Sequence, residues 1–235
     1  MLKIINLSKK FKDKTILNKI STEVAFGEIS LFIGKSGVGK STLLRILSYL
    51  ETKEEGTIHL NDKHINPLDV GMVFQNYHLF EHLTCEKNIT LALQKRLKKS
   101  KKEATMISDQ LLEKYMLKDK THRYVTSLSG GEKQRLAIAR SLALSPKIIC
   151  LDEPTSALDP TLTSHVAQII QDLGANHIVL IASHDTELIR QLWLRKANCT
   201  INLIDSGDLT ESAKLIDYFS NPSNFPKIHK FISGE

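Results

Sequence analysis

A glycine-rich run at residues 34–42 constrains the fold of this 235-residue chain more than any other feature. It reads Gly-Lys-Ser-Gly-Val-Gly-Lys-Ser-Thr and fits the pattern G-x-x-x-x-G-K-[ST]. In such a loop, backbone N–H groups turn inward on phosphates, Lys40 supplies a positive charge and Ser41 offers a hydroxyl to magnesium. Because an apolar run precedes the loop and helix formers follow from Ser41 to Leu50, the sequence predicts a nucleoside triphosphate at a helix N-terminus. The predicted nucleotide-binding residues of this loop are Gly34, Lys35, Ser36, Gly37, Val38, Gly39, Lys40, Ser41 and Thr42.

A second motif places two carboxylates, Asp152 and Glu153, directly after four apolar residues, 148–151. At the tip of a buried strand beside the phosphate loop, Asp152 can hold magnesium through its water shell. Glu153 can orient or deprotonate the water that attacks the terminal phosphate. A strand that ends in a solvated turn is the alternative, and it is common for Asp-Glu-Pro. The presence of Lys40 in the same chain favours the catalytic interpretation.

The hydrophobic content of 41% is enough to bury a substantial core. The chain has no apolar run of about eighteen residues that would span a membrane, and its N-terminus lacks the layout of a secretion signal, so we expect a cytoplasmic chain. Cys85, Cys150 and Cys199 have neither paired spacing nor histidines placed for zinc. We expect them to be reduced thiols.

The net charge of +6 suits nucleic acid, an anionic membrane face, or an ATP-binding protein with a lysine-rich surface. Charge alone does not decide between them. The most basic stretch, residues 95–102, has no interleaved aromatic residues that could stack on bases. We therefore expect it to be a solvated helix end or loop.

The order of the patterns along the chain predicts an α/β domain. Strand-like runs occur at residues 2–7, 16–24, 29–33, 57–60, 71–74, 148–151 and 178–182. From Cys85 to about Leu144 the pattern is helical. We expect one domain over residues 1–235, with a core at about 1–84 and 145–235 and a helical subdomain at about 85–144. Ligands of such a sheet bind at the C-terminal ends of its parallel strands.

A third motif, Leu128-Ser129-Gly130-Gly131-Glu132 followed by residues 133–140, resembles the signature sequence of ABC-type ATPases. Ser129 and Glu132 form an S-x-x-E capping box, which predicts a helix whose positive dipole end faces outward. The two glycines in its first turn cost roughly 1 kcal/mol each relative to alanine. Close approach of a ligand would explain that cost. In the family, this helix end meets the γ-phosphate held by the partner subunit, so the resemblance implies nucleotide contacts from Ser129, Gly130 and Gly131.

The resemblance covers nearly the whole chain and implies a P-loop NTPase core with a mixed sheet and an inserted helical subdomain. It implies that Phe11 stacks on adenine and that Ile16 packs on the same base, although a lone Phe is normally core or surface filler. Asp159 falls in a loop that runs along the dimer interface, but before Pro160 it is also an ordinary N-cap. The implied catalytic residues are Glu153, His184, Gln75 and Lys40, and the implied magnesium ligands are Ser41, Gln75 and Asp152.

A narrower resemblance to importers of polar amino acids rests on residues 43–51, 71–84 and 218–222. Four features depart from the common pattern. Lys12 replaces a glycine, Glu132 replaces a glutamine, the segment from Gly56 to Gly71 is short, and Ser183-His184-Asp185 stands for Thr-His-Glu. Glu132 keeps the capping geometry but adds negative charge near a phosphate, so affinity or turnover should differ from the pattern.

The resemblance implies the ATP-binding and ATP-hydrolysing subunit of an ABC transporter, with uptake of polar amino acids as the favoured process. Two copies would pack head to tail around two ATP molecules with Mg²⁺, on the cytoplasmic face of the membrane, together with permease subunits and a substrate-binding protein. A lipoprotein or drug exporter, and a non-transport ABC ATPase acting in cell division or on nucleic acid, remain alternatives. We expect no nucleic-acid partner. In the family, DNA-repair members carry long coiled coils and translation-associated members carry two ATPase units in one chain, whereas this chain has one ATPase unit and no heptad run.

Overall fold

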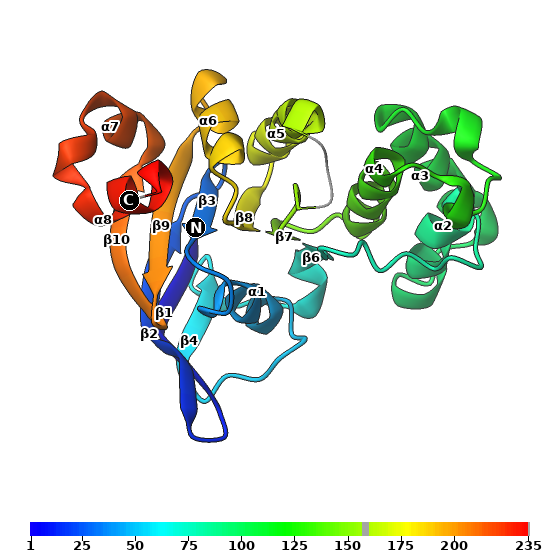
Figure 1. Cartoon of the computed structure of the whole chain (residues 1–235). Coiled ribbons are helices and arrows are strands. Elements are labelled where there is room, and N and C mark those ends of the chain that lie inside the picture. Colours follow the sequence, from blue (N-terminus) through cyan, green and yellow to red (C-terminus); the bar gives the residue numbers. More distant parts are fainter. Residues whose placement is uncertain (157–159, 235) are drawn as a thin grey trace. The chain divides into compact units, whose positions relative to one another are not determined.

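The computed structural model describes residues 1–156 and 160–234, and it forms two compact units (Figure 1). The first unit comprises Met1–Met72 and Lys147–Glu235, and the second comprises Val73–Pro146. The predicted helical segment, about residues 85–144, falls within the second unit. Asp159 lies outside the described residues.

A six-stranded sheet carries the phosphate loop, with the strand order β10-β9-β3-β8-β7-β6. Its strands are β3 (Ile29–Ile33), β6 (Val70–Val73), β7 (Ile148–Asp152), β8 (Ile178–Ala182), β9 (Cys199–Asp205) and β10 (Asp208–Lys214). Every residue of β3, β7 and β8 is buried, because both faces of this part of the sheet are covered. These strands pair in parallel, whereas β10 pairs antiparallel with β9. The mixed sheet is therefore confirmed.

A second, antiparallel sheet has the order β2-β1-β4-β5. It consists of β1 (Leu2–Phe11), β2 (Lys14–Val24), β4 (Glu55–Leu60) and the short β5 (Lys63–His64). Alternate residues of β1 and β4 are buried, as expected for strands with one face on the core. The sequence patterns missed β5, β9 and β10.

Helix α1 (Lys40–Leu47) packs in the core between the two sheets. Leu43, Leu44 and Leu47 are fully buried there, among apolar side chains from both sheets. The prediction that this helix continues to Leu50 is wrong. Tyr49 adopts a left-handed φ of 57° and ends the helix, while the N–H group of Leu50 donates to the carbonyl of Arg45 at 2.8 Å.

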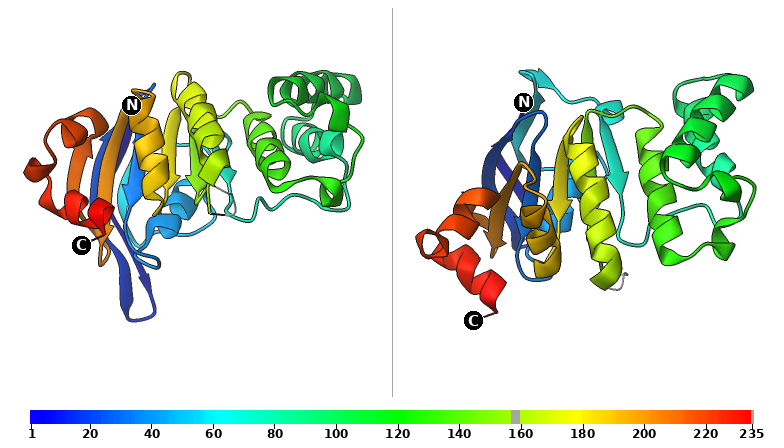
Figure 2. Two further views of the ribbon diagram at one scale, coloured as in Figure 1. Left: turned by 45° about the horizontal axis from the view of Figure 1, so that its top comes forward. Right: turned by 90° about the horizontal axis from the view of Figure 1, so that it is seen from above.

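Helices α5 (Pro160–Gly174) and α6 (Thr186–Leu194) pack against each other, and α5 also packs on β8 (Figure 2). Together they cover the face of the six-stranded sheet that is turned away from α1. Helices α7 (Leu215–Ser220) and α8 (Pro226–Ser233) follow β10 and pack beside it. The α/β alternation along the chain thus places one helical layer on each face of the central strands.

A chain of hydrogen-bonded polar side chains, two of them buried, joins three strands of the six-stranded sheet. The Asn202 amide on β9 donates to the Ser30 hydroxyl on β3 at 2.9 Å. The Ser212 hydroxyl on β10 donates to the side-chain oxygen Oδ1 of Asn202 at 2.8 Å. Asn202 and Ser30 are each only 1% exposed, so these hydrogen bonds replace those that water would make.

The second unit contains α2 (Cys85–Arg96), α3 (Lys101–Lys114) and α4 (Gly130–Leu142), and α2 packs against α3. Both α3 and α4 begin with a capping box, formed by Ser100 with Glu103 and by Ser129 with Glu132. The basic stretch, residues 95–102, covers the end of α2 and the start of α3, and most of its lysines are exposed.

All three cysteines are free and buried. Burial raises the pKa of the Cys85 thiol to about 11 and that of the Cys150 thiol to about 12. The thiols are therefore protonated at neutral pH and unreactive.

Removal of the cap of α6 tests how this helix begins. The Asp185 side chain accepts hydrogen bonds from the backbone N–H groups of Glu187 and Leu188, at 2.9 and 3.3 Å. Asp185→Ala should lower the free energy of unfolding by about 1 kcal/mol, because both donors lose their acceptor. Asp185→Asn keeps an acceptor oxygen and should remain close to the unsubstituted protein. Urea unfolding followed by circular dichroism measures both, and equal losses would contradict the capping role.

Candidate nucleotide-binding site

The phosphate loop between β3 and α1 needs glycine at two positions for steric reasons. Gly34 and Gly39 have positive φ angles of 147° and 109°. A Cβ atom would lie 2.2 Å from the Ile204 carbonyl oxygen at Gly34, and 2.7 Å from the Ile16 carbonyl oxygen at Gly39. The glycines of the motif therefore allow the loop to pass this close to neighbouring strands.

The start of α1 is built to accept an anion. Its N-cap is Gly39, which provides no side-chain cap, and none of its first-turn residues is acidic. The N–H groups at the helix start and the positive end of the helix dipole therefore face the loop. The Lys40 ammonium folds back over the loop and donates to the carbonyl oxygens of Gly34 and Lys35 at 2.8 and 3.0 Å. This arrangement fits a triphosphate.

The carboxyl ends of β7 and β8 bring three more predicted residues to the phosphate loop. The Ser41 hydroxyl donates to Asp152 Oδ1 at 2.6 Å. Lys40 Nζ lies 3.8 Å from Glu153 Oε1, and His184 Nδ1 lies 2.9 Å from Glu153 Oε2. The structure thus brings Lys40, Ser41, Asp152, Glu153 and His184 together in the first unit.

Glu153 is held in a strained backbone conformation. Its φ of 47° is uncommon for a residue with a side chain, and such strain concentrates at functional sites. Its N–H group donates to the Ala182 carbonyl at 2.8 Å, and the Ser156 hydroxyl donates to the Glu153 carbonyl at 3.1 Å. These bonds fix the turn after β7 so that the carboxylate meets Lys40 and His184.

Burial shifts the pKa values of two charged groups in the site. Burial lowers the pKa of the Lys40 ammonium, and the nearby Glu153 and Asp152 carboxylates partly offset this effect. Burial raises the pKa of Asp152, against the hydrogen bond from Ser41 and the charge of Arg45. The Ser41 hydroxyl and the Asp152 carboxylate are the hard oxygen donors that Mg²⁺ prefers.

The two residues predicted to contact adenine also lie in the first unit. The carbonyl oxygen and side chain of Ile16 lie against Gly39 of the phosphate loop. Phe11 ends β1 and is 46% exposed, with the Lys9 ammonium 4.9 Å from its ring centroid. An exposed ring of this kind is open to stacking by a base, and the adenine contact stays a prediction.

The signature residues and Gln75 belong to the second unit. Ser129 caps α4, and its N–H group donates to Glu132 Oε2 at 2.8 Å while the Glu132 N–H donates to Ser129 Oγ at 3.3 Å. The hydrogen bond from the Ser129 backbone N–H group lowers the pKa of the Glu132 carboxyl, and Lys120 Nζ lies 3.9 Å from this carboxylate. Glu132 therefore performs the capping role expected of it. Gln75 follows β6 and is exposed.

Arg140 is a structural residue that motif reasoning did not single out. It lies on α4, and its guanidinium donates to the carbonyls of Tyr77 and His78 at 2.9 and 2.6 Å. Tyr77 and His78 both have positive φ angles, so Arg140 holds the irregular segment that follows Gln75. The available signal was an arginine at the end of the run 133–140, because a partly buried guanidinium needs several acceptors.

The fold and this constellation define a P-loop nucleotide triphosphatase with a helix-capping signature motif. The family model described as ABC transporter matches residues 17–156. The chain belongs to the ABC transporter family, as an ATP-binding and ATP-hydrolysing subunit. The predicted family, fold class and ATPase activity are confirmed.

Its curated relatives match along almost their whole length. The chain is 37% identical to the glutamate transport ATP-binding protein GluA of Corynebacterium efficiens over 232 residues, 94% of each chain. It is 39% identical to the arginine transport ATP-binding protein ArtM of Bacillus subtilis, over 95% of each. It is also 39% identical to the glutamine transport ATP-binding protein GlnQ of Geobacillus stearothermophilus, over 94% of each.

Solved structures give the same fold. A dimeric structure of MJ0796, a bacterial ABC transporter cassette, superposes with a TM-score of 0.79 at 29% identity and covers 92% of this chain and 99% of that one. CbiO1 of Clostridium perfringens, part of the transporter complex cbiONQ, superposes with a TM-score of 0.81 at 23% identity, covering 99% of this chain and 98% of that one. The MJ0796 cassette is dimeric in its solved structure.

The raised pKa of Asp152 predicts how stability depends on pH. Because the folded pKa lies above the ordinary value of 3.8, the ionised carboxylate disfavours the nucleotide-free fold as pH rises through the folded pKa. Asp152→Asn keeps an acceptor for Ser41 and should raise the thermal midpoint at pH 7. The difference should shrink as the pH falls toward the ordinary value of 3.8, because Asp152 becomes protonated in the folded state. Thermal unfolding from pH 7 to pH 4 without magnesium measures it, with the exposed Asp208→Asn as control. A lower midpoint for Asp152→Asn at pH 7 would contradict the assignment.

Proposed function

We propose that this chain is the ATPase subunit of an importer for a polar amino acid. The observation that carries the proposal is the identity of 36–39% over nearly the full chain to ATP-binding proteins of glutamate, arginine and glutamine transport. The chain would work on the cytoplasmic face of the membrane with permease subunits and a substrate-binding protein. None of the helices in the described part of the chain has the length and hydropathy to cross a bilayer.

The phosphate loop would bind ATP through backbone N–H groups and the Lys40 ammonium, with Phe11 and Ile16 on the adenine. Ser41 and Asp152, joined by Gln75 from the second unit, would hold Mg²⁺. Bound there, the ion neutralises phosphate charge and helps to align the terminal phosphate for attack. Lys40 Nζ lies 3.8 Å from Glu153 Oε1, so phosphates bound at Lys40 would give it a second anionic partner and would free the Glu153 carboxylate.

Glu153 would be the general base for the attacking water. The water's proton passes to the carboxylate as its oxygen attacks the γ-phosphorus, and the bond to the β-phosphate oxygen breaks. His184, 2.9 Å from the other carboxylate oxygen, would orient Glu153 and contact the γ-phosphate. The strained backbone of Glu153 supports this role, because it fixes the direction of the side chain before substrate binds.

Two copies would complete each other's sites. Ser129, Gly130 and Gly131 would contact the γ-phosphate held by the partner subunit, and Asp159 would lie along the interface. The exposed start of α4, with its dipole and N–H groups, supports this proposal. Hydrolysis would remove the shared phosphate and separate the halves, and the permease would follow that motion.

Substitution of the proposed base separates binding from chemistry. Glu153→Gln keeps the size of the side chain and should lower ATP turnover about 10²–10⁴-fold, the usual contribution of a positioned base. ATP should then accumulate in a stable dimer, detectable by light scattering after size exclusion. Glu55→Gln, on the exposed surface of β4, is the matched control and should behave like the unsubstituted protein. Steady-state phosphate release by Glu153→Gln at the normal rate would show that another group is the base.

Reconstitution tests the transport assignment itself. The chain should stimulate uptake of glutamate, glutamine or arginine into ATP-loaded proteoliposomes that contain its permease, with binding protein outside. The Glu153→Gln subunit should still bind ATP but should support no uptake. Outward transport, or tight nucleic-acid binding at physiological salt that stimulates turnover, would favour the alternative functions, because nonspecific phosphate contacts weaken steeply with salt.

A further inference from the structure

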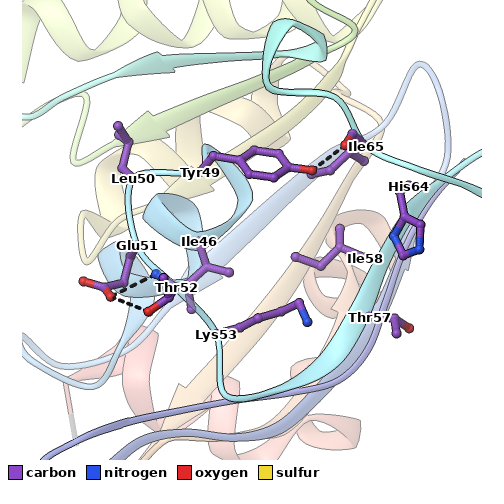
Figure 3. Close-up of a pocket in the computed structure, with 10 residues that line it drawn as sticks. All are labelled: Ile46, Tyr49, Leu50, Glu51, Thr52, Lys53, Thr57, Ile58, His64 and Ile65. Atoms are coloured by element: carbon purple, nitrogen blue, oxygen red, sulfur yellow. Dashed lines mark hydrogen bonds between the residues drawn. The ribbon is translucent and has the colours of Figure 1, made fainter.

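A cavity of about 500 Å³ lies in the first unit, where the end of α1 faces β4 and β5 (Figure 3). None of the residues assigned to the ATP site lines it. Its lining residues are Ile46, Tyr49, Leu50, Glu51, Thr52, Lys53, Thr57, Ile58, His64 and Ile65. The volume falls in the range of about 300–1,000 Å³ that is usual for small-molecule sites.

The floor of this cavity is apolar. Ile46, Ile58 and Ile65 are 4%, 7% and 5% exposed, and Figure 3 shows Ile46 and Ile58 pointing toward its centre. They belong to α1, β4 and the segment after β5, so three separate parts of the chain meet in one hydrophobic surface. A ligand with an apolar body would remove this surface from water, at about 25 cal/mol per Å² buried.

Tyr49 forms a wall of the cavity at an energetic cost. It occupies the left-handed position after α1, with φ 57°, where glycine is the usual residue. Its hydroxyl donates to the Ile65 carbonyl, which fixes the ring across the cavity (Figure 3). The residue is 51% exposed, so this hydrogen bond, rather than close packing on every side, holds the ring beside the cavity.

The uncompensated charge at the cavity is positive. Lys53 extends toward Ile58 and Thr57 in Figure 3, and its ammonium donates to the Gly56 carbonyl at 2.7 Å. Within residues 1–156 and 160–234, no carboxylate pairs with Lys53. Glu51 instead points away from the centre and pairs with Lys9 at 2.9 Å. Two N–H donors of the Lys53 ammonium therefore remain for a ligand.

We propose that this cavity binds a small anionic amphiphile. The apolar chain or ring would lie on the isoleucine floor and against the Tyr49 ring, and a carboxylate or phosphate would accept hydrogen bonds from the Lys53 ammonium. This site is separate from ATP binding and from the transported solute, so it stands whether or not the chain serves an amino-acid importer.

Calorimetric titration of the full chain with ten-carbon ligands below their micellar concentrations tests the proposal. Decanoate or decyl phosphate should bind with about one-to-one stoichiometry, and 1-decanol should bind at least tenfold more weakly, because it lacks the charge. Preference for decanoate indicates a free carboxylic acid as the natural ligand, and preference for decyl phosphate indicates a phosphate headgroup. Binding of neither anion, or equal binding of decanol, would overturn the proposal.

Matched variants identify the site. Lys53→Gln should weaken binding about tenfold or more, because a charge-assisted hydrogen bond is lost. Lys63→Gln makes the same charge change on β5 but outside the lining residues, and it should bind normally. Tyr49→Gly relieves the left-handed strain, so the fold is retained while the wall is lost, and binding should weaken severalfold at an unchanged or higher thermal midpoint. Equal effects of the two lysine variants, or undiminished binding by Tyr49→Gly, would refute this location.

Discussion

The parallel pairing of β8 with both β3 and β7 is the constraint on which the rest of the site depends. In this register Phe32 lies opposite Ala182, and Ala182 lies opposite Asp152, so the three strands end at the same edge. The phosphate loop, His184 and the two carboxylates follow directly from those ends. A shift of β7 by one residue would turn Asp152 to the other face of the sheet and break its bond to Ser41.

Several features of the site lower the stability of the folded protein. Lys40 and Asp152 are each 4% exposed, and burial opposes the charged form of both. Glu153 adds a left-handed backbone conformation. The charges of a bound ligand would offset these unfavourable contributions. The same groups therefore lower the stability of the protein alone and favour the bound state.

Much of this architecture could be predicted from local patterns. The limits of β8 follow from an uninterrupted apolar run, those of β3 from a run with Ser30 as its one polar residue, and the start of α4 from a capping box. The patterns failed at β9, because Asn202 interrupts its apolar run and its amide reaches Ser30, a residue far away in the sequence. They also failed at the end of α1, since Tyr49 stands where glycine is the usual signal. Distances such as that between Glu153 and His184 depend on strand pairing, which no local pattern contains.

The buried amide of Asn202 also governs how this sheet edge can change and assemble. Its two serine partners lie on different strands, Ser30 on β3 and Ser212 on β10. The β9–β10 hairpin therefore pairs with β3 in one register if the buried Asn202 amide is to keep both hydrogen bonds. Replacement of Asn202 removes the partner of the buried Ser30 hydroxyl, whereas apolar residues at both of these buried positions would be nearly neutral. We therefore expect substitutions of Ser30, Asn202 and Ser212 to occur together during evolution. These three side chains also disfavour other registers of β9 and β10 on β3.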